Sequence, residues 1–275
     1  MVLGLDIASR KDAYPGLQSF ELKDGILYGP IPSRRLGFSL GVNLLPLDLK
    51  ICTWDCLYCQ CGWTDRSFDH TKVDPSRFPS LQILENAFEE GFSQLAREGK
   101  IPESITLSGN GEPTLHPRFG EAVEALLKAR DHHLPQARTS VLSNGERLGE
   151  PGVRAALDRL DQRCMKLDAG DDALTGKVDR PLTPFRIGTY VERLQKLKSV
   201  TIQSFFMQGA VDNTTDAAVG PWLDCLGRIR PSSGVHLYSL DRVPPAKGLL
   251  KVPKETLEGI AAKVQALKLK AEVFA

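Results

Sequence analysis

The feature of this sequence that most constrains its fold is a regular alternation of short β-like runs with amphipathic helical stretches. Strands are predicted over residues 40–45, 104–107, 138–142, 163–167, 200–206 and 234–240, with a closing strand over 271–274. Helices are predicted over residues 80–98, 117–130, 151–160, 185–198, 216–228 and 254–267. Six such β/α units imply right-handed crossovers and a parallel sheet, arranged as a partial barrel or as a doubly wound open sheet.

Small polar residues cluster where the predicted strands end. Turns rich in Gly, Asn, Asp or Gln follow the strands at residues 108–111, 143–145, 168–170, 208–209 and 241–242. In parallel sheets, binding and catalysis take place at the carboxyl ends of the strands. We therefore expect the functional residues in these turns.

Length and composition narrow the class of protein. The 275 residues suit one large domain, and 41% hydrophobic with 25% charged residues is typical of a globular protein. The net charge of +1, from 35 basic and 34 acidic residues, lacks the basic footprint of a nucleic-acid-binding protein. Because there is no signal-peptide pattern and no apolar run of roughly 18 residues, we expect a cytoplasmic enzyme without a membrane partner.

Four of the six cysteines crowd into residues 52–61, a density that suits metal binding better than a disulfide framework. Cys52, Cys56 and Cys59 have the spacing C-x3-C-x2-C and come soon after the first predicted strand. Three thiolates so close together can hold three corners of a [4Fe–4S] cluster and leave the fourth iron open. S-adenosylmethionine (SAM) can chelate such an iron through its amino and carboxylate groups.

Two other interpretations of the cysteines stay open. One is a structural zinc site, although no second pair of zinc ligands with suitable spacing follows. The other is a closed electron-transfer cluster in which Cys61 is the fourth ligand. Cys164 and Cys225, within a predicted strand and a predicted helix, are interpreted as core residues.

The cysteine motif, with the aromatic Tyr58 directly before its last cysteine, resembles the signature of the radical SAM superfamily. A closer resemblance, to a bacterial Fe–S oxidoreductase group loosely related to the wybutosine tRNA synthases, rests on YGPIPSRRLG at 28–37, SLGV at 39–42 and further matches to residue 242. Phe38 and Cys61 depart from that group, which commonly has a basic and an aliphatic residue there. The resemblance implies that Tyr58 packs near the adenine of SAM, or else covers the cluster.

The turn after the second predicted strand resembles the superfamily's "GGEP" loop and supplies most of the predicted SAM-binding residues, which are Ser108, Gly109, Asn110, Gly111, Glu112 and Pro113. The SAM ammonium needs acceptor oxygens nearby, and backbone carbonyls reach it only where side chains are absent, as at the two glycines. Glu112 either orients the loop or adds negative charge beside the ammonium.

Later strand ends supply the remaining cofactor candidates. Asn144 either hydrogen-bonds SAM or holds a turn, and Asp168 either binds ribose hydroxyls or caps a helix. Gln208, after the fifth strand, is a candidate for the adenine side. Lys166 faces either the helices or the barrel mouth, where it binds the SAM carboxylate, binds substrate or pairs with Asp168; an exposed surface position is the alternative.

Substrate recognition is expected at the open side of the barrel. Arg34 and Arg35 either clamp a carboxylate or phosphate or form ion pairs that close the edge of the barrel, and Arg242 is a third substrate candidate. The catalytic candidates are Lys166, Cys61, Tyr238 and Asp241. His116 is interpreted as a helix-start residue, and the pair at residues 132–133 as surface.

These observations lead to a specific hypothesis. The fold is a partial (β/α)6 TIM-like barrel of the radical SAM type, a single domain over 1–275 with an N-terminal extension at 1–39, a core barrel at 40–242 and a C-terminal helix and tail at 243–275. The enzyme uses a [4Fe–4S] cluster on the three motif cysteines to cleave SAM reductively, and the 5′-deoxyadenosyl radical abstracts hydrogen from its substrate.

The expected partner is a one-electron reductant of flavodoxin or ferredoxin type. The alternatives are a tRNA-modifying enzyme of wybutosine type, a glycyl-radical activase and a non-enzymatic Fe–S electron carrier. The neutral total charge argues against tRNA, and the substrate itself, small or macromolecular, is not identified by the sequence.

Overall fold

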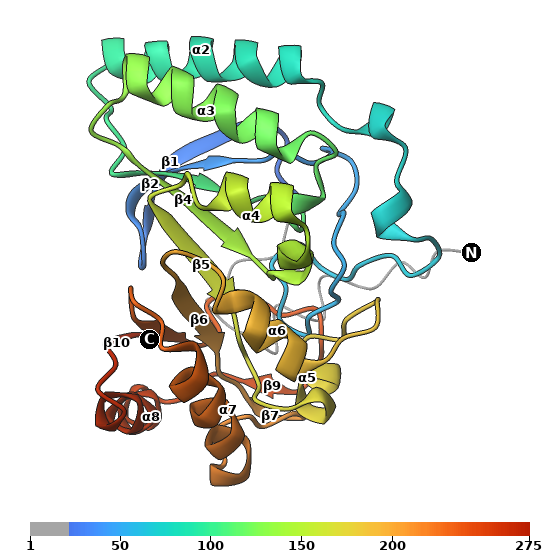
Figure 1. The fold of residues 1–275 in the computed structure, drawn as a ribbon, viewed down its shortest axis with the longest axis vertical. Helices are drawn as coiled ribbons and strands as arrows, with labels where there is room; N and C mark the ends of the chain where they lie inside the picture. The colour runs from blue at the N-terminus through green and yellow to red at the C-terminus, as the bar shows by residue number, and fades with distance from the viewer. Residues whose placement is uncertain (1–21) are drawn as a thin grey trace.

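A curved sheet of eight strands forms the centre of the computed structural model, which describes residues 22–275. Its strands, in spatial order, are β1 (Leu27–Ser33), β2 (Gly37–Val42), β3 (Ser104–Leu107), β4 (Arg138–Ser143), β5 (Gln162–Lys166), β6 (Thr201–Phe205), β8 (Val235–Tyr238) and β10 (Ala271–Phe274). Only β1 runs antiparallel to its neighbour; all other adjacent pairs in this sheet are parallel. The sheet curls into a half-barrel (Figure 1).

Helices cover the outer face of this sheet (Figure 1). They are α2 (Leu81–Arg97), α3 (Phe119–His133), α4 (Pro151–Leu157), α5 (Asp172–Val178), α6 (Ile187–Leu194), α7 (Asp216–Ile229) and α8 (Lys254–Ala266). Helix α2 begins where predicted because Ser80 caps it and accepts a hydrogen bond from the Ile83 amide. No helix in the described part of the chain is both long and apolar enough to cross a membrane.

Alternation along each strand separates the apolar core from a polar lumen. On β2 and β3, Leu40, Val42, Ile105 and Leu107 pack into the core beneath the helices. The residues between them point to the opposite face because side chains alternate along a strand. There the hydroxyl of Ser39 lies 2.8 Å from that of Thr106. The lumen therefore carries small and polar side chains around the functional end of the sheet.

The strand order settles the choice between the two predicted architectures. The neighbours follow the order of the chain from β1 to β10, and the order does not reverse at any point. A doubly wound sheet reverses direction at a switch point, whereas a barrel progresses in one direction. The predicted partial barrel is thus confirmed, and its six predicted strands correspond to β2, β3, β4, β5, β6 and β8, closed by β10.

Strand β1 is the main element that the sequence analysis did not predict. Its sequence contains Gly29, Pro30 and Pro32, and prolines argue against a central strand. As the edge strand, β1 tolerates them, since one side of it needs no partner. The sheet therefore extends into the predicted extension at 1–39, of which residues 1–21 lie outside the described part of the chain.

Two smaller elements also differ from the prediction. Helix α5 was not predicted, and the predicted turn at Gln208 forms a short strand, β7 (Gln208–Gly209). It pairs antiparallel with β9 (Leu249–Leu250) in a two-stranded sheet of its own. Gln208, predicted to lie in a turn at the end of the fifth strand, therefore lies outside the main sheet.

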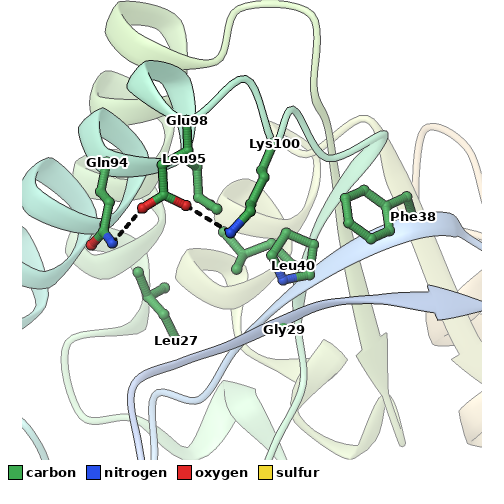
Figure 2. Close-up of a pocket in the computed structure, with 10 residues that line it drawn as sticks. Leu27, Gly29, Phe38, Leu40, Gln94, Leu95, Glu98 and Lys100 are labelled. Atoms are coloured by element: carbon green, nitrogen blue, oxygen red, sulfur yellow. Dashed lines mark hydrogen bonds and ion pairs between the residues drawn. The ribbon is translucent and has the colours of Figure 1, made fainter.

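An outer cavity of about 450 Å³ lies between α2 and the β1–β2 edge. Figure 2 shows Leu27, Leu40 and Leu95 around it, with Glu98 bound by Gln94 at 2.7 Å and by Lys100 at 2.8 Å. The lining contains none of the predicted site residues. It belongs to the helix-covered face and not to the lumen.

Candidate active site

The cysteine loop is joined by backbone hydrogen bonds to the turn after β3. The Ile51 amide donates to the Asn110 carbonyl at 2.9 Å, and the Glu112 amide donates to the Ile51 carbonyl at 2.9 Å. These bonds place Cys52 and Cys56, both buried, and the half-buried Cys59 at the mouth of the half-barrel. All three line one cavity with the side chains of the strand ends.

The spacing of the three sulfurs discriminates between kinds of metal site. Within residues 22–275, the only His, Cys, Asp and Glu side chains whose ligand atoms all lie within 4.8 Å of one another are Glu89, His132 and His133. A tetrahedral zinc ion with Zn–S bonds near 2.3 Å holds its sulfurs roughly 3.8 Å apart. The three cysteine sulfurs are therefore not all within 4.8 Å of one another, which is wider than one tetrahedral zinc ion requires.

Buried Asp55 fixes the middle of the cysteine loop. Its carboxylate accepts hydrogen bonds from the Thr64 amide at 2.7 Å and from Arg66 Nε at 3.1 Å. Arg180 approaches the same carboxylate at 3.3 Å. Because Asp55 is only 2% exposed, its charge depends on these partners, so the loop is locked to residues on both sides of it.

Lys50, directly before the loop, is a site residue that the sequence analysis missed. It is 4% exposed, and its ammonium donates to the Gly62 carbonyl at 2.6 Å. Burial lowers the pKa of Lys50, but the thiolates of Cys59, Cys52 and Cys56 outweigh burial and raise it. Its position directly before the four clustered cysteines could have marked Lys50 as a site residue, but lysines are usually exposed.

The thiols respond differently to their surroundings. Burial raises the pKa of Cys52 to about 12 and that of Cys56 well above its usual range. A hydrogen bond with Cys61, helped by Lys50, overcomes burial and lowers the pKa of Cys59 to about 5. The thiol of Cys61 itself donates to the Gly109 carbonyl at 3.1 Å.

The glycines after β3 are required by contacts within the protein. Gly111 has φ +134°, and a Cβ there would lie 1.8 Å from the Ile51 carbonyl oxygen. At Gly109, with φ +150°, a Cβ would lie 2.4 Å from Oδ1 of Asn43. The buried Asn110 side chain donates to the carbonyls of Lys23 and Pro46. The loop is therefore shaped to press against the cysteine loop, a reason that the sequence did not reveal.

Glu112 links the turns after β3 and β4. Its carboxylate accepts from the hydroxyls of Thr114 and Ser143 at 2.6 and 2.8 Å, and from the amides of Thr114 and Asn144 at 3.1 and 2.7 Å. Burial nevertheless raises the pKa of Glu112. Of the two predicted roles, this geometry is that of a loop-orienting residue. Pro113 follows it, buried at the start of a short 3-10 helix.

Lys166 points into the lumen as the centre of a buried charge cluster. Its ammonium lies 2.6 Å from Asp168 and 3.2 Å from Asp179, and it hydrogen-bonds the Tyr58 hydroxyl. Tyr58 also bonds Asp168 and stacks on Phe205 with ring centroids 3.4 Å apart. The surface alternative for Lys166 is excluded, and pairing with Asp168 is what the structure shows.

The second oxygen of Asp168 is occupied as well. Oδ1 accepts a hydrogen bond from the Phe205 amide at 2.7 Å, and the side chain is fully buried. Asn144 behaves similarly, because its side-chain nitrogen donates to Thr53 at 3.1 Å and its oxygen caps the Glu146 amide at 3.0 Å. Both residues use their polar atoms to hold the strand ends in place.

Two adjoining cavities of about 350 and 230 Å³ share Cys52, Cys59, Arg35 and Arg242 in their linings. They bring together most of the predicted site residues: Arg34, Arg35, Cys52, Cys56, Tyr58, Cys59, Cys61, Ser108, Gly109, Gly111, Glu112, Asn144, Lys166, Tyr238, Asp241 and Arg242. Asn110, Pro113, Asp168 and Gln208 do not line them. Gln208 bonds Thr214 instead, in the separate two-stranded sheet.

The adjacent arginines at the mouth have different partners. Arg34 pairs with Asp241 at 3.2 Å and reaches the Phe274 carbonyl at 3.3 Å. Arg35 donates to Gln203 at 2.7 Å and stacks on the Tyr238 ring, 4.1 Å from its centroid. The two guanidiniums therefore do not form the predicted two-arginine clamp.

The predicted histidines fall outside the cavity. His116 is buried and hydrogen-bonds the Pro79 carbonyl at 3.0 Å. His132 is exposed, as predicted, and the half-buried His133 lies 2.7 Å from Glu89 on the outer helices.

Fold and site together define a parallel half-barrel with a three-cysteine loop at its mouth. The family profile of the Radical SAM superfamily matches residues 48–216, a range that includes the cysteine loop and strands β3 to β7. The chain belongs to the radical SAM superfamily.

Similar sequences carry the family name UPF0026. The chain is 29% identical over 233 residues to the UPF0026 protein of Methanocaldococcus jannaschii, a match that covers 83% of this chain and 67% of that protein. A UPF0026 protein of Helicobacter pylori is 34% identical over 159 residues, or 57% of this chain and 46% of the relative. The chain thus spans about half the length of the Helicobacter relative.

Solved structures share the fold. A radical SAM methyltransferase from Sphaerobacter thermophilus has a TM-score of 0.61 and 17% identity, over 86% of this chain and 65% of its own. TYW1 with a lysine-pyruvate adduct bound has a TM-score of 0.56 and 16% identity, over 83% of this chain and 73% of its own. At these identities the likeness shows the half-barrel and not a shared substrate.

Membership in the superfamily establishes the general activity. The chain is an enzyme of SAM-dependent radical chemistry, and the family implies SAM, an iron–sulfur cluster and a one-electron reductant. Both the fold and the enzyme class predicted from the sequence are confirmed.

Proposed function

We propose that this chain binds a [4Fe–4S] cluster through Cys52, Cys56 and Cys59 and uses it to cleave SAM reductively, abstracting hydrogen from a small anionic substrate. The observation that carries the proposal is that Cys52, Cys56 and Cys59 line one cavity with the strand ends, while their sulfurs do not all lie within 4.8 Å of one another. When bound, the cluster supplies the electron that splits SAM into methionine and a 5′-deoxyadenosyl radical.

The residues present fit the cluster. The three motif cysteines supply the right kind of ligand, thiolate, and leave one corner without a protein ligand. Cys61 is not a good fourth ligand, because its thiol is engaged by the Gly109 carbonyl, to which it donates at 3.1 Å. This contact argues against the closed electron carrier.

The turn residues divide into two groups around SAM. Tyr58, Ser108, Gly109, Gly111, Glu112 and Asn144 line the cavity, and we assign the SAM-facing surface to them. Asn110, Pro113 and Asp168 support that surface from behind through their buried contacts. Gln208 lies in another sheet, so the side chain from this region that lines the cavity is Gln203.

The charge of Lys166 is neutralised within the protein. Two carboxylates lie within 3.2 Å of its ammonium, so the buried cluster as a whole carries no excess positive charge for an anion. Its contact with the Tyr58 hydroxyl instead fixes the aromatic residue of the cysteine motif. We assign Lys166 the role of orienting Tyr58 beside SAM.

Arg35 is the best candidate for binding the substrate. Its partners, Gln203 and Tyr238, are both uncharged, and no carboxylate of the described residues lies within 4.0 Å of its guanidinium. Arg242 lines both cavities beside it, whereas the charge of Arg34 is offset by Asp241. A rigidly held guanidinium that lacks an acidic partner suits a carboxylate or phosphate group.

Location and partners follow from the chemistry. Because cluster thiolates stay reduced in a reducing compartment, we infer a cytoplasmic enzyme with a reductant of flavodoxin or ferredoxin type. The mouth residues and the cofactor loops belong to one half-barrel, so we infer that 1–275 acts as a single catalytic domain.

Single replacements of the four clustered cysteines test the proposal. After anaerobic reconstitution, Cys52→Ala, Cys56→Ala and Cys59→Ala should each lose cluster iron and 5′-deoxyadenosine formation. Cys61→Ala should keep both. Loss of the cluster in Cys61→Ala would instead support the closed electron carrier, and copurified tRNA with steeply salt-dependent binding would support the wybutosine-type alternative.

A further inference from the structure

We propose that Lys50 is a built-in counter-charge that raises the reduction potential of the cluster, an inference that rests on the cluster proposed above. The observation behind this proposal is that the charged side chain of Lys50 is buried. An ammonium group only 4% exposed lies beneath the cysteine loop, and buried charges in proteins are paired.

No carboxylate of residues 22–275 lies within 4.0 Å of the Lys50 ammonium, in contrast to the buried Lys166 with its two aspartates. The oxygen acceptor it has is the Gly62 carbonyl at 2.6 Å. A carbonyl satisfies one of the three ammonium donors and supplies no full negative charge. The turn that supplies this carbonyl also carries Cys59, so the thiolates that would hold the cluster supply the negative charge for Lys50.

The surrounding backbone keeps Lys50 in this position. The Gly62 amide donates to the Cys59 carbonyl at 3.0 Å, which closes the turn that presents the acceptor of Lys50. On the other side, Ile51 is hydrogen-bonded to Asn110 and Glu112. The ammonium is thus bound to the same turn that carries Cys59 and cannot move to solvent without losing its hydrogen bond to Gly62.

A fixed positive charge beside the thiolates favours the reduced cluster. One electron passes from the reductant to the cluster, which becomes more negative by one charge, and Lys50 stays protonated throughout, so no proton moves. A nearby cation and a hydrogen bond to a ligand sulfur stabilise the more negative state more strongly. The potential is therefore higher with Lys50 than without it.

The test is a redox titration of the reconstituted protein with dithionite, followed by electron paramagnetic resonance. In Lys50→Met, the ratio of reduced to oxidised cluster at a fixed applied potential should fall at least tenfold, which is a shift of about 59 mV for one electron. Lys50→Arg should restore the wild-type ratio. The control is Lys72→Met, because Lys72 is exposed on the far end of the loop segment.

Lys50→Gln, which keeps a donor for the Gly62 carbonyl, carries the measurement if the methionine variant loses iron. Iron binding by Lys50→Arg but by neither neutral variant also supports the counter-charge. An unchanged potential in an iron-loaded neutral variant overturns the proposal, and so does loss of iron in all three variants. Absence of a [4Fe–4S] signal in the wild type would instead refute the proposed function itself.

Discussion

Gly111 is the position at which one added methyl group should separate the cysteine loop from the barrel. Its φ of +134° is a conformation that residues with a side chain rarely adopt. A Cβ there would lie 1.8 Å from the Ile51 carbonyl oxygen, which is backbone and cannot rotate away. Real Cβ contacts are not shorter than 3.0 Å, so Ile51 must move by at least 1.2 Å (3.0 minus 1.8) in Gly111→Ala.

The cost has two parts. Holding alanine in this region of φ costs about 1–3 kcal/mol. The displacement also disrupts the two 2.9 Å bonds that Ile51 makes with Asn110 and Glu112, at about 1 kcal/mol net each. Gly111→Ala should therefore lower the free energy of unfolding by about 3–5 kcal/mol. Because Cys52 follows Ile51 directly, the shift should also lower iron binding.

Gly99→Ala separates backbone strain from the contact. Gly99 has φ +67°, but no atom lies within 4 Å of a Cβ placed there. This variant should lose only about 1–2 kcal/mol and bind iron normally. Urea unfolding and iron per chain after anaerobic reconstitution measure both effects. If Gly111→Ala matches Gly99→Ala in stability and iron content, the reasoning about the Ile51 contact is wrong.

Three further predictions concern buried polar groups. Asp55→Asn should lower the free energy of unfolding by about 2–3 kcal/mol and reduce iron binding, because it leaves Arg180 near an uncharged amide. The control is Asp48→Asn, at an ion pair whose aspartate is 73% exposed. It should lower the free energy of unfolding by less than about 1 kcal/mol in the same urea assay. Glu112→Gln should lower the free energy of unfolding by about 2–4 kcal/mol, because the new side-chain amide donor must point at groups that themselves donate. Thermal unfolding with the cluster bound measures this. Burial, helped by Arg35, lowers the pKa of His236 to about 4, below its unfolded value near 6.5. The associated stability is present above about pH 6.5 and is lost as the pH falls toward 4, by up to about 2 kcal/mol at pH 5, and His236→Phe should flatten this part of the urea-unfolding profile. An unchanged pH profile in that variant would exclude the histidine as its source.

Periodicity explains why the fold could be predicted from the sequence. The parallel strands show alternation or continuous apolar runs, and the polar turns after them mark the carboxyl ends that carry the site. Strand β1 could not be predicted because Gly29, Pro30 and Pro32 are acceptable only at an edge, and pairing with β2 is a long-range property.

The site could be predicted only where a motif fixes residues by spacing. The cysteine loop and the turn after β3 are of this kind. The environment of Lys50, the bonds of Glu112 and the separate partners of Arg34 and Arg35 depend on loops meeting in space. Neighbours in sequence need not share a ligand, and a lysine next to a motif carries no sign of its burial.

The most direct test of the central claim is electron paramagnetic resonance of the anaerobically reconstituted, dithionite-reduced enzyme with and without SAM, followed by measurement of 5′-deoxyadenosine by mass spectrometry. We predict a [4Fe–4S] signal that changes when SAM is added, together with formation of 5′-deoxyadenosine. A signal indifferent to SAM, and no cleavage with several reductants, would contradict the account.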